Sequence, residues 1–336
     1  MGKRLSKLGI NIVKTIAGPV LVFMFFLALT NLTGNAGFGT GADLRTIIYN
    51  VCYSGFIALA VSYNLSSGRL DFSVGSVLIL SLIVGGTLAQ NWNVGPVGLL
   101  LLVLAVGLAC GLVSGLLYVL LNLPAMVTAL GVTMIFEAIA YKMNGGNGVR
   151  LIGKFSMLIW AQWPYNVLLL IVVLLILSYI LGYTKFGYNS KALQTGQKNA
   201  VDVGINERVN AIICYVIAGG LMACAGVLYI SQYGYIAPST GLASSSFIMS
   251  AFLPMFIGTA LAKYSNRNIG VIMGAIIQAS LSSALVKLGA SSSLNTVFNG
   301  AAVLLLLVYV SNSHKILIAK AHNIKKQKAL AEIEQN

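Results

Sequence analysis

Residues 165–183 read YNVLLLIVVLLILSYILGY, a run in which Leu, Ile and Val follow one another almost without interruption. A helix of that length rises about 28 Å, close to the roughly 30 Å thickness of the hydrocarbon core of a bilayer. The whole chain has this character, because 58% of its 336 residues are hydrophobic and only 8% are charged. Soluble domains carry roughly 25% charged residues, so the composition excludes a water-soluble fold.

Similar apolar runs recur along the chain and predict an all-α integral membrane protein, a polytopic bundle of about ten transmembrane helices. We interpret residues 1–336 as one transmembrane domain with a short cytoplasmic tail at 312–336. An inverted internal repeat is an open alternative within this arrangement. The predicted spans are 16–32, 46–65, 72–90, 96–121, 124–143, 165–183, 210–230, 244–262, 269–287 and 294–311.

Glycines recur at four-residue spacing within two of these spans, at Gly107, Gly111 and Gly115 and at Gly270 and Gly274. Small residues let helix backbones approach closely in lipid, where hydrophobicity does not drive association. The spacing therefore predicts that both helices pack tightly against other helices.

The basic residues indicate how the chain is oriented. With the N-terminus inside, the ten-span map places 16 of the 21 Lys and Arg residues in cytoplasmic segments and the remaining 5 outside. Cytoplasmic segments are enriched in Lys and Arg, so both termini are predicted to be cytoplasmic, in a bacterial inner membrane. This distribution accounts for the net charge of +14, and no nucleic-acid partner is predicted.

Residue types for catalysis or metal binding are scarce. Both histidines, His314 and His322, lie in the tail, and the four cysteines lie within apolar runs without CxxC spacing. Residues 148–155, GVRLIGKF, resemble a phosphate-binding loop, but Phe155 stands where Ser or Thr would bind Mg²⁺. We therefore predict no enzyme activity, no metal site and no cofactor of this chain's own.

The segment SGRLDFSVGS at 67–76 places an acidic residue, Asp71, at the mouth of an apolar span. A carboxylate is costly there unless it caps a helix or has a partner. We predict that Asp71 caps the helix that begins at Phe72, with Arg69 as a pairing partner. A direct role of Asp71 in gating or coupling is the alternative.

The longest cytoplasmic loop, residues 184–209, mixes small, polar and charged residues between two strong spans. Its apolar positions predict a short amphipathic helix or a pair of turns, ended by Gly204 as a C-cap. The loop is either a solvated connector or an element that docks a partner and transmits force. Its docking candidates are Ala192, Leu193, Lys198, Ala200, Asp202, Gly204 and Ile205.

The order and spacing of these motifs resemble the permeases of bacterial ABC importers for ribose and other monosaccharides, over roughly residues 45–310. LDFSVGS at 70–76 is similar to the signature segment of that family, in which Asp71, Ser73 and Gly75 match. LPAMVTALG at 123–131 resembles the next motif of the family. The loop at 184–209 falls where the family docks its ATPase.

This resemblance implies a permease subunit that imports a small neutral polar solute, in the first place a monosaccharide, with ATP hydrolysed by partner subunits. It implies three partners: an ABC ATPase, a second permease subunit (identical or not) and an extracytoplasmic solute-binding protein. Nucleosides and branched-chain amino acids are the alternative solutes.

Polar side chains within the spans are candidates for the solute pathway, because such side chains tend to face protein or water. Hydrogen bonding between helices is the alternative for each of them. Glu137, in mid-span, is expected to face protein or a water-filled path, or to pair with Lys142. Glu137 alone gives little support for an ion-coupled secondary transporter, which would need buried carboxylates or broken helices. The pathway candidates are Asn50, Tyr53, Ser54, Asn64, Thr133, Glu137, Tyr141, Gln278 and Asn299.

Overall fold

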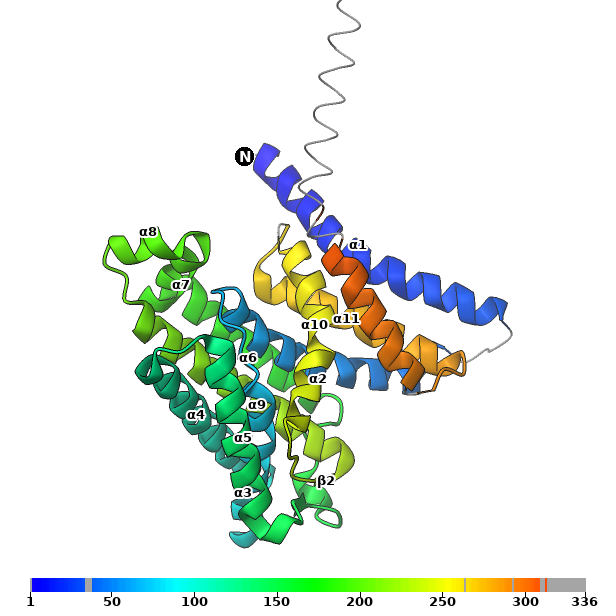
Figure 1. Cartoon of the computed structure of the whole chain (residues 1–336). Coiled ribbons are helices and arrows are strands. Elements are labelled where there is room, and N and C mark those ends of the chain that lie inside the picture. The colour runs from blue at the N-terminus through cyan, green and yellow to red at the C-terminus, as the bar shows by residue number, and fades with distance from the viewer. Residues whose placement is uncertain (1, 34–37, 263, 292, 309–311, 313–336) are drawn as a thin grey trace, which may run out of the picture.

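The structure, a computed structural model, describes residues 2–33, 38–262, 264–291, 293–308 and 312. This part of the chain is a bundle of long helices with two very short strands (Figure 1). The long helices are α1 (Gly2–Leu32), α2 (Gly41–Leu65), α3 (Val74–Asn91), α4 (Pro96–Leu121), α5 (Ala125–Lys142), α6 (Tyr165–Tyr183), α9 (Glu207–Tyr233), α10 (Ser246–Leu261), α11 (Arg267–Lys287) and a last helix at Ser293–Val308. The shorter elements are η1 (Met143–Gly146), β1 (Val149–Arg150), η2 (Phe155–Met157), α7 (Lys185–Thr195), α8 (Gln197–Asp202), β2 (Tyr235–Ile236) and η3 (Ala243–Ser245).

The predicted all-α membrane fold is confirmed. Among the described residues, nine helices are long and apolar enough to cross a membrane, and each overlaps one of the first nine predicted spans. The tenth predicted span, 294–311, corresponds to the shorter apolar helix Ser293–Val308, and residues 309–311 lie outside the described part of the chain.

Both glycine patterns mark close helix contacts, as expected. A Cβ on Gly111 of α4 would lie 2.4 Å from the carbonyl oxygen of Tyr215 in α9. A Cβ on Gly274 of α11 would lie 2.2 Å from the carbonyl oxygen of Pro254 in α10. The backbones of these helix pairs therefore touch, as small residues permit in a membrane. Helix α9, the most buried span by fraction, runs through the middle of the bundle.

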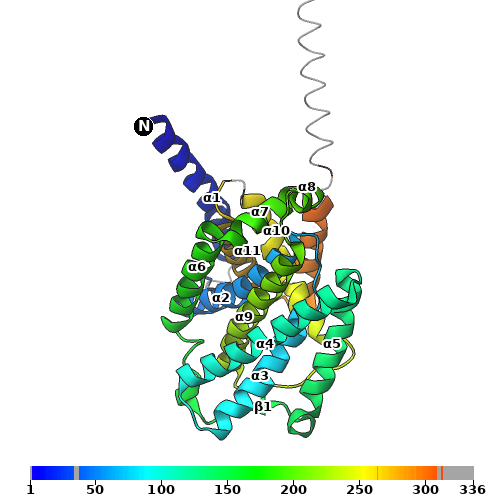
Figure 2. The ribbon, with the colours of Figure 1, turned by 90° about the vertical axis from the view of Figure 1, so that its left-hand side faces the viewer.

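The two ends of the bundle carry different elements (Figures 1 and 2). Helices α7 and α8 lie at one end, on the same side as the N-terminal end of α1. Strands β1 and β2 lie at the opposite end, paired antiparallel with Val149 opposite Ile236. Near the start of α2, Thr40 and Asp43 form a capping box, and Asp43 also pairs with Lys287 of α11 at 3.0 Å. The short helices α7 and α8 and the strands β1 and β2 therefore lie at opposite ends of the bundle, where the ends of membrane spans meet water.

Candidate functional site

The segment before α3 is held by the carboxylate of Asp71. One of its oxygens accepts hydrogen bonds from the backbone amide and the hydroxyl of Ser73, at 2.8 and 2.6 Å. The other accepts one from the side-chain amide of Asn64, at 3.3 Å. Helix α3 begins at Val74, with Ser73 as its N-cap and no side-chain cap hydrogen bond. The predicted start at Phe72 is therefore two residues too early, and the prediction that Asp71 caps the helix is wrong: its carboxylate instead holds the turn at Ser73.

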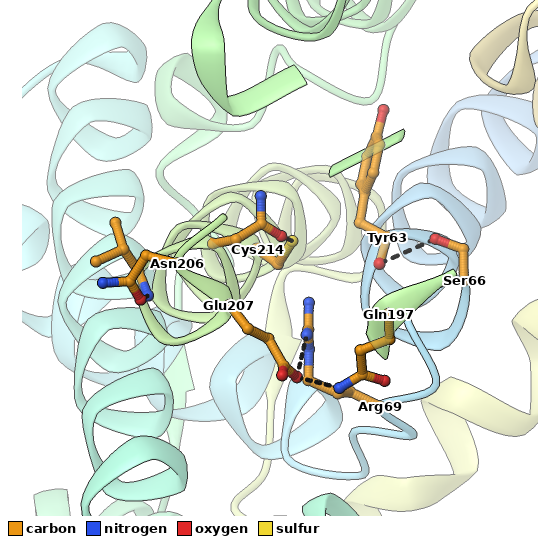
Figure 3. A network of polar contacts seen from close by, with 9 residues as sticks. Tyr63, Ser66, Arg69, Gln197, Asn206, Glu207 and Cys214 are labelled. Atoms are coloured by element: carbon orange, nitrogen blue, oxygen red, sulfur yellow. Dashed lines mark hydrogen bonds and ion pairs between the residues drawn. The ribbon is translucent and has the colours of Figure 1, made fainter. Parts of the chain in front are cut away.

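Arg69 does not pair with Asp71, as the sequence had suggested. Its buried guanidinium lies 3.6 Å from the carboxylate of Glu207 in the first turn of α9. Glu207 also accepts a hydrogen bond of 2.6 Å from the side chain of Gln197 in α8 (Figure 3). Since Asp71 is already satisfied by Ser73 and nearby Asn64, Arg69 is free to connect its segment to α8 and α9.

Glu137 of α5 is buried and binds backbone rather than a cation. Its two carboxylate oxygens accept hydrogen bonds from the amides of Leu242 and Ser244, each at 2.9 Å. The suggested pairing with Lys142 is wrong, because both oxygens face the turn that opens η3 and α10. A carboxylate at the N-terminus of a helical segment is stabilised by the free amides there.

Two further contacts bring the start of α3 against the same turn and against α5. A Cβ on Gly75 would lie 2.2 Å from the carbonyl oxygen of Ser244, so only glycine fits at this approach. The hydroxyl of Thr133 donates to the carbonyl of Phe72 at 3.2 Å and to that of Ala129. Residues 71–75, 133–137 and 242–244 thus form one packed unit, which we call the central junction.

The central junction lies within the span of α5, away from its ends. Glu137 follows the first residue of α5 by twelve positions, about 18 Å along the axis, and precedes its last residue by five, about 8 Å. Two helices, α3 and α10, therefore begin inside the bundle, each at a carboxylate. Irregular backbone is tolerated at membrane depth only where it is buried in protein or lines a water-filled cavity.

Helices α7 and α8, residues 185–202, form a short pair that we call the docking arm. Gly204 follows it with a φ of 90°, and the amide of Ile205 bonds to the carbonyl of Ala200 at 3.1 Å. This is the left-handed helix end that the sequence suggested. Leu193 and Ala200 are buried against their own chain. They therefore offer a partner no surface, which corrects the expected contact face.

The outward surface of the docking arm is made by other residues. Lys198, Asp202 and Gly204 are exposed, and Ala192 and Ile205 are half-buried. Val201 and Val203 expose 43% and 81% of their surface, which supplies the apolar part of this face. Whether these residues bind a partner remains a prediction.

A second cation, the half-buried Arg267, ties the docking arm to the bundle. Arg267, the first residue of α11, donates to the side-chain carbonyl of Gln194 in α7 and to the hydroxyl of Ser66, both at 2.7 Å. Ser66 directly follows α2, in the segment that leads to Asp71. Arg69 and Arg267 thus link the docking arm to one segment, 66–73. Sequence reasoning missed both links, because the partners are distant in the chain and belong to no motif.

Ser54 and Tyr53 of α2 make contacts within the bundle. The hydroxyl of Ser54 donates to the carbonyl of Asn50 at 2.7 Å. Tyr53 stacks on Tyr49 and packs against Tyr229 of α9, with ring centroids 6.1 and 6.0 Å apart. These contacts fit the alternative of helix packing.

The candidates nearer the C-terminus lie in other parts of the bundle. Gln278 of α11 donates to the carbonyl of Ser250 in α10 at 2.7 Å, while its buried side-chain oxygen has no partner. Asn299 bonds to Asn295 on its own helix at 3.0 Å, and Tyr141 is exposed on α5. The structure gathers Asn64, Thr133 and Glu137 at or beside the central junction and leaves the other candidates scattered.

Among the described residues, no group of three or more His, Cys, Asp or Glu side chains lies close enough to hold a metal ion. The four cysteines are free and buried. The contacts described above at these sites are hydrogen bonds and an ion pair.

Comparison with known proteins places these features in context. A family model described as the permease component of the branched-chain amino acid transport system matches residues 44–308. The Autoinducer 2 import system permease protein LsrC of Photorhabdus luminescens is 27% identical over 259 residues, which cover 75% of this chain and 77% of that protein. The protein of the same name from Yersinia pseudotuberculosis serotype O:3 (strain YPIII) is 26% identical over 278 residues, 81% of this chain and 77% of that one.

A solved structure has a similar fold. It is described as an inward-facing conformation of a metal-chelate type ABC transporter, and the match covers 88% of this chain and 98% of that one. The TM-score is 0.54 and the sequence identity is 16%. At this identity the match shows a shared helix arrangement.

Proposed function

Since the chain belongs to the family described as the permease component of the branched-chain amino acid transport system, we propose that it is the membrane subunit of a sugar-importing ABC transporter. It moves a small neutral polar solute across the bacterial inner membrane with energy from ATP that partner subunits hydrolyse. Its partners are an ABC ATPase, a second permease subunit and an extracytoplasmic solute-binding protein. The chain itself needs no cofactor.

The observation that carries this proposal is the docking arm with the two arginines that link it to the bundle, the buried Arg69 and the half-buried Arg267. Helices α7 and α8 project at one end of the bundle, and Arg69 and Arg267 connect them to the segment that positions α3. Figure 3 shows the first of these links, from Arg69 through Glu207 to Gln197 of α8. A solvated connector needs no such links to buried groups. An element that receives force from an ATPase needs them, because a displacement of α7 and α8 must reach the transmembrane helices.

This assignment orients the molecule. The end that carries the docking arm faces the cytoplasm, and the N-terminal end of α1 lies at the same end (Figure 2). The end that carries β1 and β2 then faces outward, where a solute-binding protein docks. This orientation agrees with the excess of Lys and Arg predicted for cytoplasmic segments.

The hydrogen bonds at the central junction favour a neutral solute over a charged one. Both of its carboxylates are occupied, Asp71 by Ser73 and Asn64 and Glu137 by the amides of Leu242 and Ser244. The starts of α3 and α10 inside the bundle are broken helices of the kind that secondary transporters use for ions. With both carboxylates engaged, neither is available to bind a coupling ion, so ATP is the favoured energy source.

A sugar is favoured by the relatives, which are permeases of an autoinducer 2 import system. The description of the matching family favours a branched-chain amino acid as the second candidate. An amino acid carries a separate ammonium and carboxylate, each of which needs a countercharge when it leaves water. The pathway candidates include one charged residue, Glu137, and its carboxylate is engaged.

The test is uptake into proteoliposomes that contain the complete transporter, with the solute-binding protein supplied outside and ATP inside. We expect ATP-dependent accumulation of a labelled sugar that vanadate abolishes, and no accumulation of labelled leucine. A transporter with the catalytic glutamate of its ATPase replaced by glutamine is the matched control. Uptake that survives vanadate but collapses with an uncoupler would instead establish an ion-coupled carrier.

A further inference from the structure

The segment between β2 and η3, residues 237–242, enters the bundle without forming a helix. It leaves the end of the bundle that carries β1 and β2 at Ile236, which pairs with Val149, and at Leu242 its backbone amide donates to Glu137. Leu242 has a φ of 68°, a left-handed conformation that is unusual for a branched side chain. The two hydrogen bonds from Leu242 and Ser244 to Glu137 hold it there.

The backbone just before Leu242 is not satisfied by the protein. Within the described chain, the amides of Ser239, Thr240 and Gly241 donate to no backbone or side-chain acceptor. Thr240 and Gly241 are also exposed. A free amide in hydrocarbon costs several kcal/mol, so lipid cannot cover this surface.

The exposed face of α10 continues the same surface toward the docking-arm end. The exposed residues of α10 are Ser246, Met249, Ser250, Thr259 and Ala260. Three of these five carry hydroxyls. The hydroxyls alone would tolerate lipid, because each bonds to a carbonyl of its own helical segment at 2.7–2.8 Å. Ser246 and Ser250 lie one turn apart on the same side of α10, next to the unpaired backbone of 239–241, whereas Thr259 lies on the opposite side. The combination of these two hydroxyls with the unpaired backbone distinguishes this face from an ordinary lipid-facing helix.

Helix α6 provides the contrast. Between positions 168 and 176 its exposed side chains are all aliphatic, namely Leu168, Ile171, Val172, Leu175 and Ile176. Such a surface is what lipid requires. The two helices therefore differ in what covers them.

Unpaired polar atoms also lie directly beneath this face. The hydroxyls of Ser244 and Ser245 and the side-chain oxygen of Gln278 are buried without a hydrogen-bond partner. Each such atom has lost its hydrogen bonds to water without gaining one to protein, which costs free energy. A rearrangement that brings water or a hydroxylated solute to this face would recover that free energy.

We propose that residues 239–246 and the face of α10 with Ser246 and Ser250 form a wall of the aqueous solute path. This inference rests on the proposed import function and assigns the path to a place in the fold. This wall suits neutral hydroxylated solutes. It offers unpaired backbone amides as donors, serine hydroxyl oxygens as acceptors, and no charged side chain. Polar contacts with free amides would replace part of the solute's hydration as it passes.

The test is the chemical accessibility of single cysteines in the assembled transporter. Ser246→Cys and Ser250→Cys are compared with Ile171→Cys and Leu175→Cys on α6, and the buried native cysteines give the background. The probe is a small, permanently charged methanethiosulfonate reagent, which travels only through water. We expect the α10 positions to react at least about tenfold faster than the α6 positions, and their modification to lower sugar uptake by the same sample.

Two outcomes would contradict the proposal that this face lines the solute path. One is reaction at positions 246 and 250 as slow as at 171 and 175. The other is quantitative cross-linking of these cysteines between two permease copies with no access for the reagent, which would make the face a subunit contact. Failure of unmodified transporter to accumulate sugar would reject the proposed function instead, whatever the labelling rates.

Discussion

The central junction and the docking arm are both fixed by charged side chains, but the charges bind different things. At the junction, Asp71 and Glu137 accept hydrogen bonds from backbone amides at 2.8–2.9 Å, and both carboxylates are buried. At the docking arm, Arg69 and Arg267 reach mainly other side chains, and part of that network is open to solvent. Backbone contacts fix the position of a segment, whereas side-chain contacts can exchange partners when helices shift.

This difference suggests different roles for the docking arm and the central junction during transport under the proposed function. Under the proposed function the docking arm is the part that moves, because its contacts run through the long side chains of Gln197, Glu207 and Arg69. The junction responds as a unit, since its segments touch through backbone. Segment 66–73 joins the two regions, which makes it the route from ATPase to solute path under the proposed function.

The largest effect is expected from removing the carboxylate at the junction. Glu137→Leu leaves the amides of Leu242 and Ser244 without acceptors, at a cost of about 1–3 kcal/mol for each group. We expect a severe loss of purified protein and a much lower melting temperature in detergent. Glu137→Gln keeps one acceptor oxygen and should fall between this variant and the wild type.

Lys142→Gln on the same helix is the matched control, because Glu137 does not pair with Lys142. It should purify and melt like the wild type. If Glu137→Leu melted no lower than Lys142→Gln, the junction would not depend on its carboxylate.

The next effect is expected at the contact between α3 and η3. Gly75→Ala would place a Cβ 2.2 Å from the carbonyl oxygen of Ser244, so α3 or the η3 turn must shift. We expect normal insertion but a large drop in uptake and a lower melting temperature. Gly131→Ala on α5 meets no atom within 4 Å and should be neutral or slightly stabilising, since alanine favours helix. Equal melting temperatures for the two variants would contradict this.

The sequence predicted the spans better than the contacts between them. Runs such as Tyr165–Tyr183 have a length and an apolarity that only a membrane helix satisfies, and nine predicted spans match helices of the structure. Asp71 and Glu137 could be singled out because a buried carboxylate is costly. Their partners could not, because Glu137 binds amides 105 and 107 residues away, and a backbone amide has no signature in the sequence.

The docking arm shows a second limit of sequence reasoning. Leu193 and Ala200 stand out as apolar positions in a polar loop, and their pattern indicates one buried face. The pattern does not say whether that face is covered by the same chain or by a partner. The structure buries both residues against their own bundle and leaves Val201 and Val203 outside.

A smaller effect is expected from breaking a link between the two regions. Glu207→Gln removes the charge opposite Arg69, whose guanidinium is buried and whose remaining nitrogens have no partner. We expect the ATPase to co-purify normally, while solute-stimulated ATP hydrolysis and uptake fall about tenfold, which corresponds to about 1.4 kcal/mol. The exchange Arg69→Glu with Glu207→Arg should restore part of the activity.

Arg208→Ala, an exposed neighbour in the same turn of α9, is the control for this link and should transport like the wild type. Loss of ATPase binding in Glu207→Gln would show that the pair shapes the docking surface itself. Full activity in the same variant would show that force reaches the junction by another route.

The smallest effect is expected at the end of the docking arm, where Gly204 has a φ of 90° and no atom lies within 4 Å of a Cβ built on it. Space is therefore not the obstacle to Gly204→Val; the obstacle is backbone conformation, because a residue with a Cβ resists the left-handed region by about 1–2 kcal/mol. That strain weakens the bond from Ile205 to Ala200 that ends α8 and tilts the exposed face of Val201 and Val203. We expect normal insertion, and an affinity for the ATPase reduced about fivefold to tenfold in a titration of detergent-purified subunits. Gly196→Val, between α7 and α8, is the matched control: the φ of Gly196 is −176°, which any residue adopts, so its affinity should be unchanged. Equal affinities for both variants would show that the end of α8 lies outside the docking surface and that contact is confined to the rest of the arm.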